Sequence, residues 1–157
     1  MTKLAAPKST PASAKSAAGR PYRTEIRVRF GDCDPAGIVF YPRYLEIFNA
    51  LVEDWCRDEL QYSFPELITH RGWGLPTVHL EVDFVAPSRF GDVLSATLTV
   101  EKVGKSSVNI TINLCSPDGG ERVRGKVVLV LIDRKPHKAI PIPDDLRARM
   151  LAFRAGE

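Results

Sequence analysis

Alternation of apolar and polar residues predicts five strands. In the segment Thr24 to Phe30, Ile26, Val28 and Phe30 share one side and charged residues separate them, which is the period-two pattern of a half-buried strand. Four similar segments follow, at residues 78–84, 94–100, 108–114 and 123–132. Because the connections between these four are short, we expect antiparallel neighbours that form a meander. The run Val127 to Ile132 is apolar on both faces, which favours a central place in the sheet.

A long helix is predicted to begin at Pro42. Proline suits the first helical position, and Glu46 lies near the positive end of the helix that follows. The apolar positions form a stripe wider than a surface helix needs: Tyr44, Leu45, Ile47, Phe48, Leu51, Val52, Trp55 and Cys56. We therefore expect most of its circumference to be buried. Shorter helical segments are expected within residues 62–74 and 142–153.

One buried helix and about five antiparallel strands indicate an α+β domain. The arrangement that accommodates both is the hotdog fold, in which a curved antiparallel sheet wraps around one long central helix. A single sheet of this kind leaves an edge strand open, and pairing two copies along that edge covers it. We therefore expect self-association as a homodimer or a homotetramer.

Composition limits the number of domains. A chain of 157 residues with 44% hydrophobic residues fits one globular domain, which we place at residues 21–157. Residues 1–20 contain no acidic residue and almost no large apolar residue, so we expect a disordered basic tail. An organelle transit peptide is the alternative, but the segment has one arginine and no clear amphipathic face. Without an apolar run of about 18 residues, we expect a cytoplasmic protein with no membrane partner.

Charge and cysteine content exclude further classes. The net charge of +3 is small and lies partly in the first twenty residues, so no nucleic-acid partner is expected. The cysteines Cys33, Cys56 and Cys115 are widely spaced and odd in number, which argues against a disulfide framework. The three histidines share no ligand spacing with each other or with cysteine. We therefore expect no metal site and no cofactor.

The candidate chemistry lies between the first strand and the long helix, in the segment RFGDCDPAGIVFYP at residues 29–42. Its carboxylates, Asp32 and Asp34, lie beside a helix N-terminus, whose unpaired amides and positive dipole end stabilise negative charge on an oxygen. Gly37 allows the backbone to approach a ligand closely. The usual motifs of serine hydrolases, zinc hydrolases and nucleotide-binding loops are absent from the sequence. Because a thiolate is a good leaving group, one carboxylate and backbone amides are sufficient for thioester cleavage.

Each residue of this segment also has a structural interpretation. Asp34 is in the setting of an ordinary turn aspartate that binds backbone amides, and Asp32 is expected to tighten the loop. The side chain of Tyr41 is suited to be only an apolar plug at the helix entrance. Cys33 is a poor nucleophile candidate because the neighbouring carboxylates raise the pKa of its thiol.

The run from Arg29 to Pro42, continued by RYLEIFN at residues 43–49, resembles the 4-hydroxybenzoyl-CoA thioesterase family of hotdog enzymes. The shared signature is Asp-x-Asp-x-x-Gly followed by three apolar residues and tyrosine, ahead of the central helix. A looser likeness covers about residues 24–134. The resemblance implies that the chain is an acyl-CoA thioesterase, with Asp34 as nucleophile or general base. It also implies that the amide of Tyr41 polarises the thioester carbonyl.

The same resemblance implies substrate contacts. Lys105 stands where the family places a basic residue for the phosphates of coenzyme A. Asn49 occupies the helix position at which the 4-hydroxybenzoyl enzymes carry an aspartate that binds the substrate phenol, and Leu75 replaces a threonine near the same pocket. The acyl group is therefore expected to be aromatic, such as benzoyl or hydroxybenzoyl, or short. The basic residues at 122–126 and 134–138 form either a solvated face or a surface that attracts coenzyme A.

Two other functions remain open at this point. A hotdog thioesterase can act on acyl-carrier-protein substrates, and a hotdog protein can bind acyl-CoA without cleaving it. A hotdog dehydratase is disfavoured, because its chemistry requires a histidine paired with a carboxylate and no histidine lies near the motif.

Overall fold

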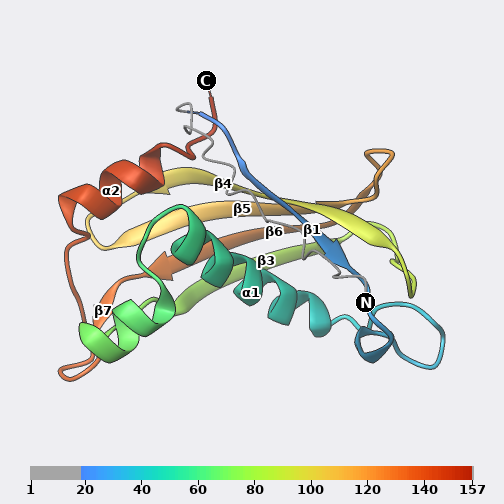
Figure 1. Ribbon diagram of the computed structural model, residues 1–157, viewed down its shortest axis with the longest axis horizontal. Coiled ribbons are helices and arrows are strands. Elements are labelled where there is room, and N and C mark those ends of the chain that lie inside the picture. The colour runs from blue at the N-terminus through green and yellow to red at the C-terminus, as the bar shows by residue number, and fades with distance from the viewer. Residues whose placement is uncertain (1–18, 157) are drawn as a thin grey trace, which may run out of the picture.

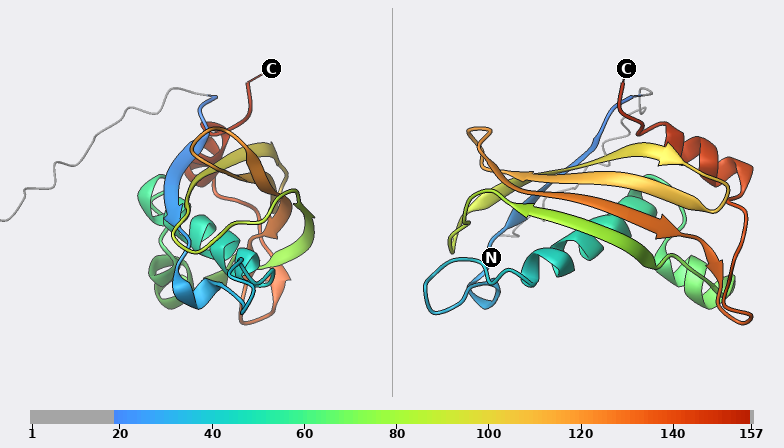
Figure 2. Two further views of the ribbon diagram at one scale, coloured as in Figure 1. Left: turned by 90° about the vertical axis from the view of Figure 1, so that its right-hand side faces the viewer. Right: turned by 180° about the vertical axis from the view of Figure 1, so that it is seen from behind.

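The computed structural model describes residues 19–156. Its main sheet consists of β1 (Tyr22–Arg27), β3 (Thr77–Phe84), β4 (Val93–Val103), β5 (Ser107–Cys115) and β6 (Glu121–Val130). All pairs are antiparallel, in the order β1-β4-β5-β6-β3. The sheet curves around the long helix α1 (Arg43–Asp58), as the end view in Figure 2 shows. This is the predicted α+β hotdog arrangement.

The remaining elements extend one end of the molecule. A short helix, η2 (Glu66–His70), leads from α1 towards a small sheet of β2 (Trp73–Gly74), β7 (Ile132–Asp133) and β8 (Lys138–Ala139). The C-terminal helix α2 (Asp144–Leu151) lies at the same end, across from the loop that precedes α1 (Figure 1). The two shorter helices fall within the predicted segments 62–74 and 142–153. Within residues 19–156, no helix combines the length and apolar character needed to cross a bilayer.

The core lies between α1 and the concave face of the sheet. Every second residue of β4 from Leu94 to Val100 is buried, which confirms the alternation read from the sequence. The helix contributes six buried side chains: Tyr44, Phe48, Leu51, Val52, Trp55 and Cys56. The prediction that most of the circumference of α1 is buried is wrong for a single chain. The side of the helix with Glu46 and Asn49 is exposed, and Leu45 is 38% exposed.

The first strand ends earlier than predicted. β1 stops at Arg27, and residues Phe30–Asp32 form the 3-10 turn η1. The carboxylate of Asp32 accepts a hydrogen bond from the Arg29 amide at 2.9 Å, and the Asp32 amide donates to the Arg29 carbonyl at 3.0 Å. These reciprocal bonds bend the chain away from the sheet. Phe30 is therefore 80% exposed instead of facing the core.

The predicted meander is wrong for β3, which pairs with β6 and not with β4. Only β4, β5 and β6 form a meander. The loop between β3 and β4 spans residues 85–92, and eight extended residues reach about 26 Å, more than the roughly 14 Å across three strand spacings. Arg122 at the start of β6 fastens this loop. Its carbonyl accepts from the amides of Val85 and Ala86, and its Nη1 donates to the Pro87 carbonyl at 2.6 Å.

β6 lies between β5 and β3, so the predicted central position of the strand that carries Val127 is confirmed. The predicted disordered tail falls almost entirely on residues 1–18, which lie outside the described residues.

Candidate active site

The loop before α1 is built from backbone hydrogen bonds. The Asp34 amide donates to the Ile38 carbonyl and the Phe40 amide donates to the Asp32 carbonyl, both at 2.9 Å. Between them, the Gly37 amide donates to the Asp34 carbonyl at 2.9 Å, which closes a tight turn. Gly37 has a φ of +78°, a backbone conformation that favours glycine. The loop therefore has one defined shape, with Asp34 at its first corner.

The Asp34 carboxylate is half-buried and has two different oxygens. Oδ1 accepts a hydrogen bond from the Ala36 amide at 2.9 Å, as a turn aspartate does. Among residues 19–156, Oδ2 has no hydrogen-bond partner. A cavity of about 300 Å³ lies against this side chain, with Phe40 and Arg43 on its other walls. The turn thus orients the carboxylate and leaves one oxygen able to contact a ligand.

The N-terminus of α1 supplies backbone donors next to this loop. Its first turn is closed by the amides of Arg43 and Tyr44, which donate to the carbonyls of Phe40 and Tyr41 at 2.9 and 3.2 Å. Within the described part of the chain, the Tyr41 amide has no backbone partner. This amide lies just before the positive end of a sixteen-residue helix. The arrangement can therefore polarise a carbonyl oxygen or hold an oxyanion.

The side chain of Tyr41 covers the helix entrance only in part. It is 61% exposed and packs edge-to-face on Phe40 and on Phe84, with ring centroids 5.5 and 6.0 Å apart. Phe84 is the last residue of β3. This contact ties the N-terminal end of α1 to one end of the sheet's edge strand.

Cys33, between the two aspartates, is held as a thiol. Partial burial and then the charges of Asp32, Asp34 and Asp92 raise its pKa above the ordinary value. The Cys33 Sγ donates to the Arg29 carbonyl at 3.6 Å. Because a nucleophilic cysteine requires a lowered pKa, the electrostatics of this position disfavour a thiolate.

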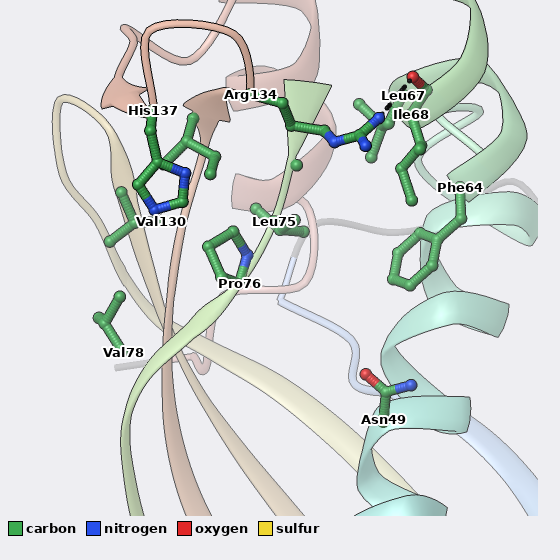
Figure 3. A pocket seen from close by; sticks show the side chains of 12 residues that line it. Asn49, Phe64, Leu67, Ile68, Leu75, Pro76, Val78, Val130, Arg134 and His137 are labelled. Carbon is green, nitrogen blue, oxygen red and sulfur yellow. Dashed lines mark hydrogen bonds between the residues drawn. The ribbon is translucent and has the colours of Figure 1, made fainter. Parts of the chain in front are cut away.

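Asn49 and Leu75 lie in a second place, against a cavity of about 620 Å³ between α1, η2 and β7 (Figure 3). Its walls are mostly apolar, with Phe64, Leu67 and Pro76 among them. A smaller cavity of about 50 Å³ is also lined by Asn49 and Leu75, together with Leu80 of β3. The predicted neighbourhood of Asn49 and Leu75 therefore exists, and its apolar lining suits an acyl group.

Within one chain these two places are separate. Asn49 follows Tyr41 by eight residues, which corresponds to about 12 Å along the helix axis. The loop with Asp34, Gly37 and Tyr41 lies at the Phe84 end of β3, whereas Asn49 and Leu75 lie at its Thr77 end. Lys105 is exposed at the turn between β4 and β5, where its carbonyl accepts from the Ile142 amide at 2.9 Å.

The sequence reasoning missed several residues of the larger cavity. Phe64 carried no recognised signal, and Pro76 was noted only as part of the looser likeness over residues 24–134. Arg134 was noted only as a member of a basic cluster, and His137 as a member of that cluster and as a histidine without ligand spacing. One signal was present: Val130, Ile132 and Arg134 alternate along the chain and line the same cavity. Among residues 19–156, no cluster of three or more His, Cys, Asp or Glu side chains could hold a metal ion.

Comparison with known proteins gives consistent relatives. A 1,4-dihydroxy-2-naphthoyl-CoA hydrolase from Synechocystis sp. is 27% identical over 120 residues, covering 76% of this chain and 86% of that protein. A 4-hydroxybenzoyl-CoA thioesterase from Pseudomonas sp. is 26% identical over 126 residues, covering 76% and 89%. The solved structure of a gentisyl-coenzyme A thioesterase matches with a TM-score of 0.71 and 29% identity, covering 84% of this chain and 98% of that one.

A family model also matches most of the described chain. It is the model of the thioesterase-like superfamily, and it matches residues 28–150, which include the loop with Asp34, the helix α1 and the cavity with Asn49. The resemblance inferred from residues 29–49 is thereby confirmed. By its fold, its loop and this match, the chain belongs to the thioesterase-like superfamily.

Proposed function

We propose that this protein hydrolyses acyl-CoA thioesters, with Asp34 as the catalytic carboxylate and aromatic acyl groups as the preferred substrates. One observation carries the proposal: an aspartate whose Oδ1 is fixed by the Ala36 amide and whose Oδ2 is unpartnered stands in the loop before the amide-rich end of α1. The relatives that act on hydroxybenzoyl, gentisyl and dihydroxynaphthoyl thioesters support the choice of aromatic substrates.

The chemistry uses the two groups in turn. The Tyr41 amide donates to the thioester carbonyl oxygen, which makes the carbonyl carbon more electrophilic. Asp34 then either attacks that carbon through Oδ2, giving a mixed anhydride that water hydrolyses, or removes a proton from an attacking water molecule. In both routes the C–S bond breaks, coenzyme A leaves as a thiolate and the acyl group becomes a free acid. Single-turnover hydrolysis in oxygen-18 water tests for the anhydride route. If water cleaves the anhydride at the Asp34 carboxyl carbon, the label enters Asp34 and the acid has two unlabelled oxygens, whereas direct attack of water on the acyl carbon labels the acid and leaves Asp34 unlabelled.

A second copy of the chain completes the site in this proposal. β3 is an edge strand, and three of its apolar side chains, Val78, Leu80 and Phe84, are exposed. Antiparallel pairing of β3 with the same strand of a second copy covers them and satisfies the open edge. It also brings the Phe84 end of one copy to the Thr77 end of the other. The Asp34 loop of one copy then faces the Asn49 and Leu75 cavity of its partner.

In this assembly each part of the substrate is assigned to a part of the protein. The apolar cavity takes the acyl group, and Asn49 donates or accepts a hydrogen bond with a ring substituent. Lys105, exposed at the same end of the molecule as the cavity, attracts the phosphates of coenzyme A. Homodimer formation is therefore part of the function. A homotetramer requires a further interface, which the open β3 edge does not supply.

The decisive variant is Asp34→Asn. Asparagine keeps the oxygen that accepts from Ala36, so the loop should fold, while the ability to attack or to take a proton is lost. We expect thiol release from benzoyl-CoA to fall at least about 100-fold. Asp54→Asn, the same change at a half-buried carboxylate of α1 that pairs with Arg57, is the control and should keep wild-type turnover. Wild-type turnover in Asp34→Asn would refute the catalytic assignment.

A mixing experiment tests the shared site. Leu75→Trp fills the cavity without touching the Asp34 loop. When Asp34→Asn and Leu75→Trp chains are co-expressed in equal amounts, random dimers contain intact composite sites that should restore about a quarter of wild-type turnover. No restoration, with mixed dimers present, would mean that each copy uses its own cavity.

Substrate panels address the remaining alternatives. Acyl-CoA and acyl-carrier-protein thioesters at equal concentration distinguish the two thioesterase classes. Binding of acyl-CoA without thiol release from any thioester would indicate a non-catalytic acyl-CoA-binding protein.

A further inference from the structure

The large cavity is apolar apart from three polar side chains, and two of these belong to basic residues. Asn49 lies on α1 at one side, whereas Arg134 and His137 lie across the cavity on the hairpin between β7 and β8 (Figure 3). A cavity built only for an unsubstituted ring has no need of an arginine in its wall. The composition of the wall indicates a ligand that is apolar along its body and anionic at one end.

Arg134 is positioned by several contacts. Its amide donates to the Gly72 carbonyl at 3.0 Å, and its Nη1 donates to the Ile68 carbonyl at 3.3 Å. The stem lies across Gly74, where an added Cβ would be 3.5 Å from the Arg134 Cγ. Within the part of the chain that the structure describes, the guanidinium has no carboxylate partner. Most of its donors are therefore available to a ligand in the cavity.

His137 is placed by an uncommon backbone conformation. Its φ is +55°, in the left-handed region that few non-glycine residues adopt, at the turn that joins β7 to β8. The nearest acidic side chain of this hairpin, Asp133, is engaged elsewhere, because its Oδ1 accepts from the Lys135 amide at 3.0 Å. Lys135 and Lys138 are exposed beside it. The hairpin therefore presents a positive potential to the cavity mouth.

We propose, resting on the proposed function, that the acyl group bears a carboxylate at the end distant from the thioester and that Arg134, assisted by His137, binds it. Guanidinium and carboxylate form paired, charge-assisted hydrogen bonds that neutral partners do not equal. Arg134 and His137 share one cavity with Asn49 and Leu75 and are thus neighbours of the acyl group. Lys105, the residue assigned to the coenzyme A phosphates, lies outside that cavity lining.

The test uses ligands that do not depend on hydrolysis. The ligands are thioethers of coenzyme A that carry a 4-methylbenzyl group, a 4-carboxybenzyl group or carboxyalkyl chains of increasing length. A second series attaches the same groups to pantetheine, which lacks the nucleotide phosphates. Calorimetry measures the dissociation constants. We expect at least one carboxylated ligand to bind the wild type about tenfold more tightly than its uncharged partner, on both carriers.

Variants show which residues cause the preference for carboxylated ligands. Arg134→Gln should abolish the preference for the carboxylate and leave binding of the 4-methylbenzyl ligands unchanged within twofold. His137→Asn, which tolerates the left-handed backbone, should reduce the preference. Arg23→Gln, the same change at an exposed arginine of β1, the edge strand opposite β3, is the control and should change nothing. Matching thioesters then show whether the same preference governs kcat/KM.

Two results would overturn the proposal. One is a wild type with no preference for any carboxylated ligand. The other is an Arg134→Gln variant that binds charged and uncharged ligands equally weakly, but only when they are attached to coenzyme A. That result would assign Arg134 to the phosphates of coenzyme A. If carboxylated thioethers show the Arg134-dependent preference but no thioester is hydrolysed, the proposed function fails and the binding inference stands.

Discussion

Gly125 in β6 provides a sharp test of how α1 sits on the sheet. The residue is buried in the middle of the strand, opposite Ile112 of β5 and Val82 of β3. A Cβ placed on it would lie 2.3 Å from Cε2 and 2.8 Å from Cζ of Phe48, the ring that α1 presses against the sheet. These distances are too short for real carbon atoms. Gly125→Ala therefore requires either the ring or the strand to move.

The size of the effect follows from what can move. β6 is hydrogen-bonded on both sides, so the ring of Phe48 moves, and the cavity of about 50 Å³ beside it takes part of the displacement. Overpacking a buried site costs about 1–3 kcal/mol, while replacing glycine in a strand returns about 0.5–1 kcal/mol. We expect a net loss of about 1–2 kcal/mol in the free energy of unfolding. At this chain length the melting temperature should fall by about 2–8 °C.

The measurement is urea unfolding followed by tryptophan fluorescence, which reports on Trp55, fully buried against Phe153, and on Trp73. All variants are compared at one protein concentration, because self-association adds to apparent stability. Gly31→Ala is the control, since no atom lies within 4 Å of its added Cβ. Phe48→Leu removes the clash, so Gly125→Ala should cost less in that background. A Gly125→Ala protein as stable as the wild type would refute this account. So would a double variant in which the effects of Gly125→Ala and Phe48→Leu on the free energy of unfolding simply add.

Two further predictions concern side chains near the ends of α1. Cys33→Ser should keep kcat/KM within twofold in a thiol-release assay, because burial and three carboxylates raise the pKa of the Cys33 thiol; a loss of 100-fold would make it the nucleophile. Tyr22 donates to Asp58 at 3.2 Å, and burial followed by the Asp58 charge raises its pKa from about 10 to about 12. Its stabilising contribution is therefore complete below pH 10 and is lost as the pH rises through 12. In urea melts at pH 10 and pH 12, Tyr22→Phe should lose less stability than the wild type over this interval, and equal losses would contradict the assignment.

The parts of the fold that follow from local patterns were predictable. The strand alternation, the wide apolar stripe of α1 and the turn residues between Asp32 and Gly37 all act over a few neighbouring positions. The end of β1 was missed because Phe30 continues the alternation, although the capping contacts between Arg29 and Asp32 turn the chain first. Periodicity detects which side chains alternate and does not detect a competing turn.

In the candidate site, too, only the residues specified by a local pattern could be predicted. Asp34, Gly37 and Tyr41 fall within eight residues of sequence, so a linear motif was enough to find them. Asn49 and Leu75 were placed through the resemblance alone. The residues across the cavity, Arg134 and His137, are brought there by the pairing of β7 with β2, which no local signal specifies. Long-range pairing between two-residue strands has too little sequence pattern to be recognised.

The position of β3 determines how the Asp34 loop and the Asn49 cavity are arranged relative to each other. In the predicted meander β3 would have been held next to β4. Its pairing with β6 leaves its other edge open and puts the Asp34 loop at one end and the Asn49 cavity at the other. Two-fold pairing along an edge exchanges the ends of a strand. In the proposed dimer, an open strand with half of a site at each end therefore gives two whole sites, and restoration of turnover in mixed dimers is the result that this geometry predicts.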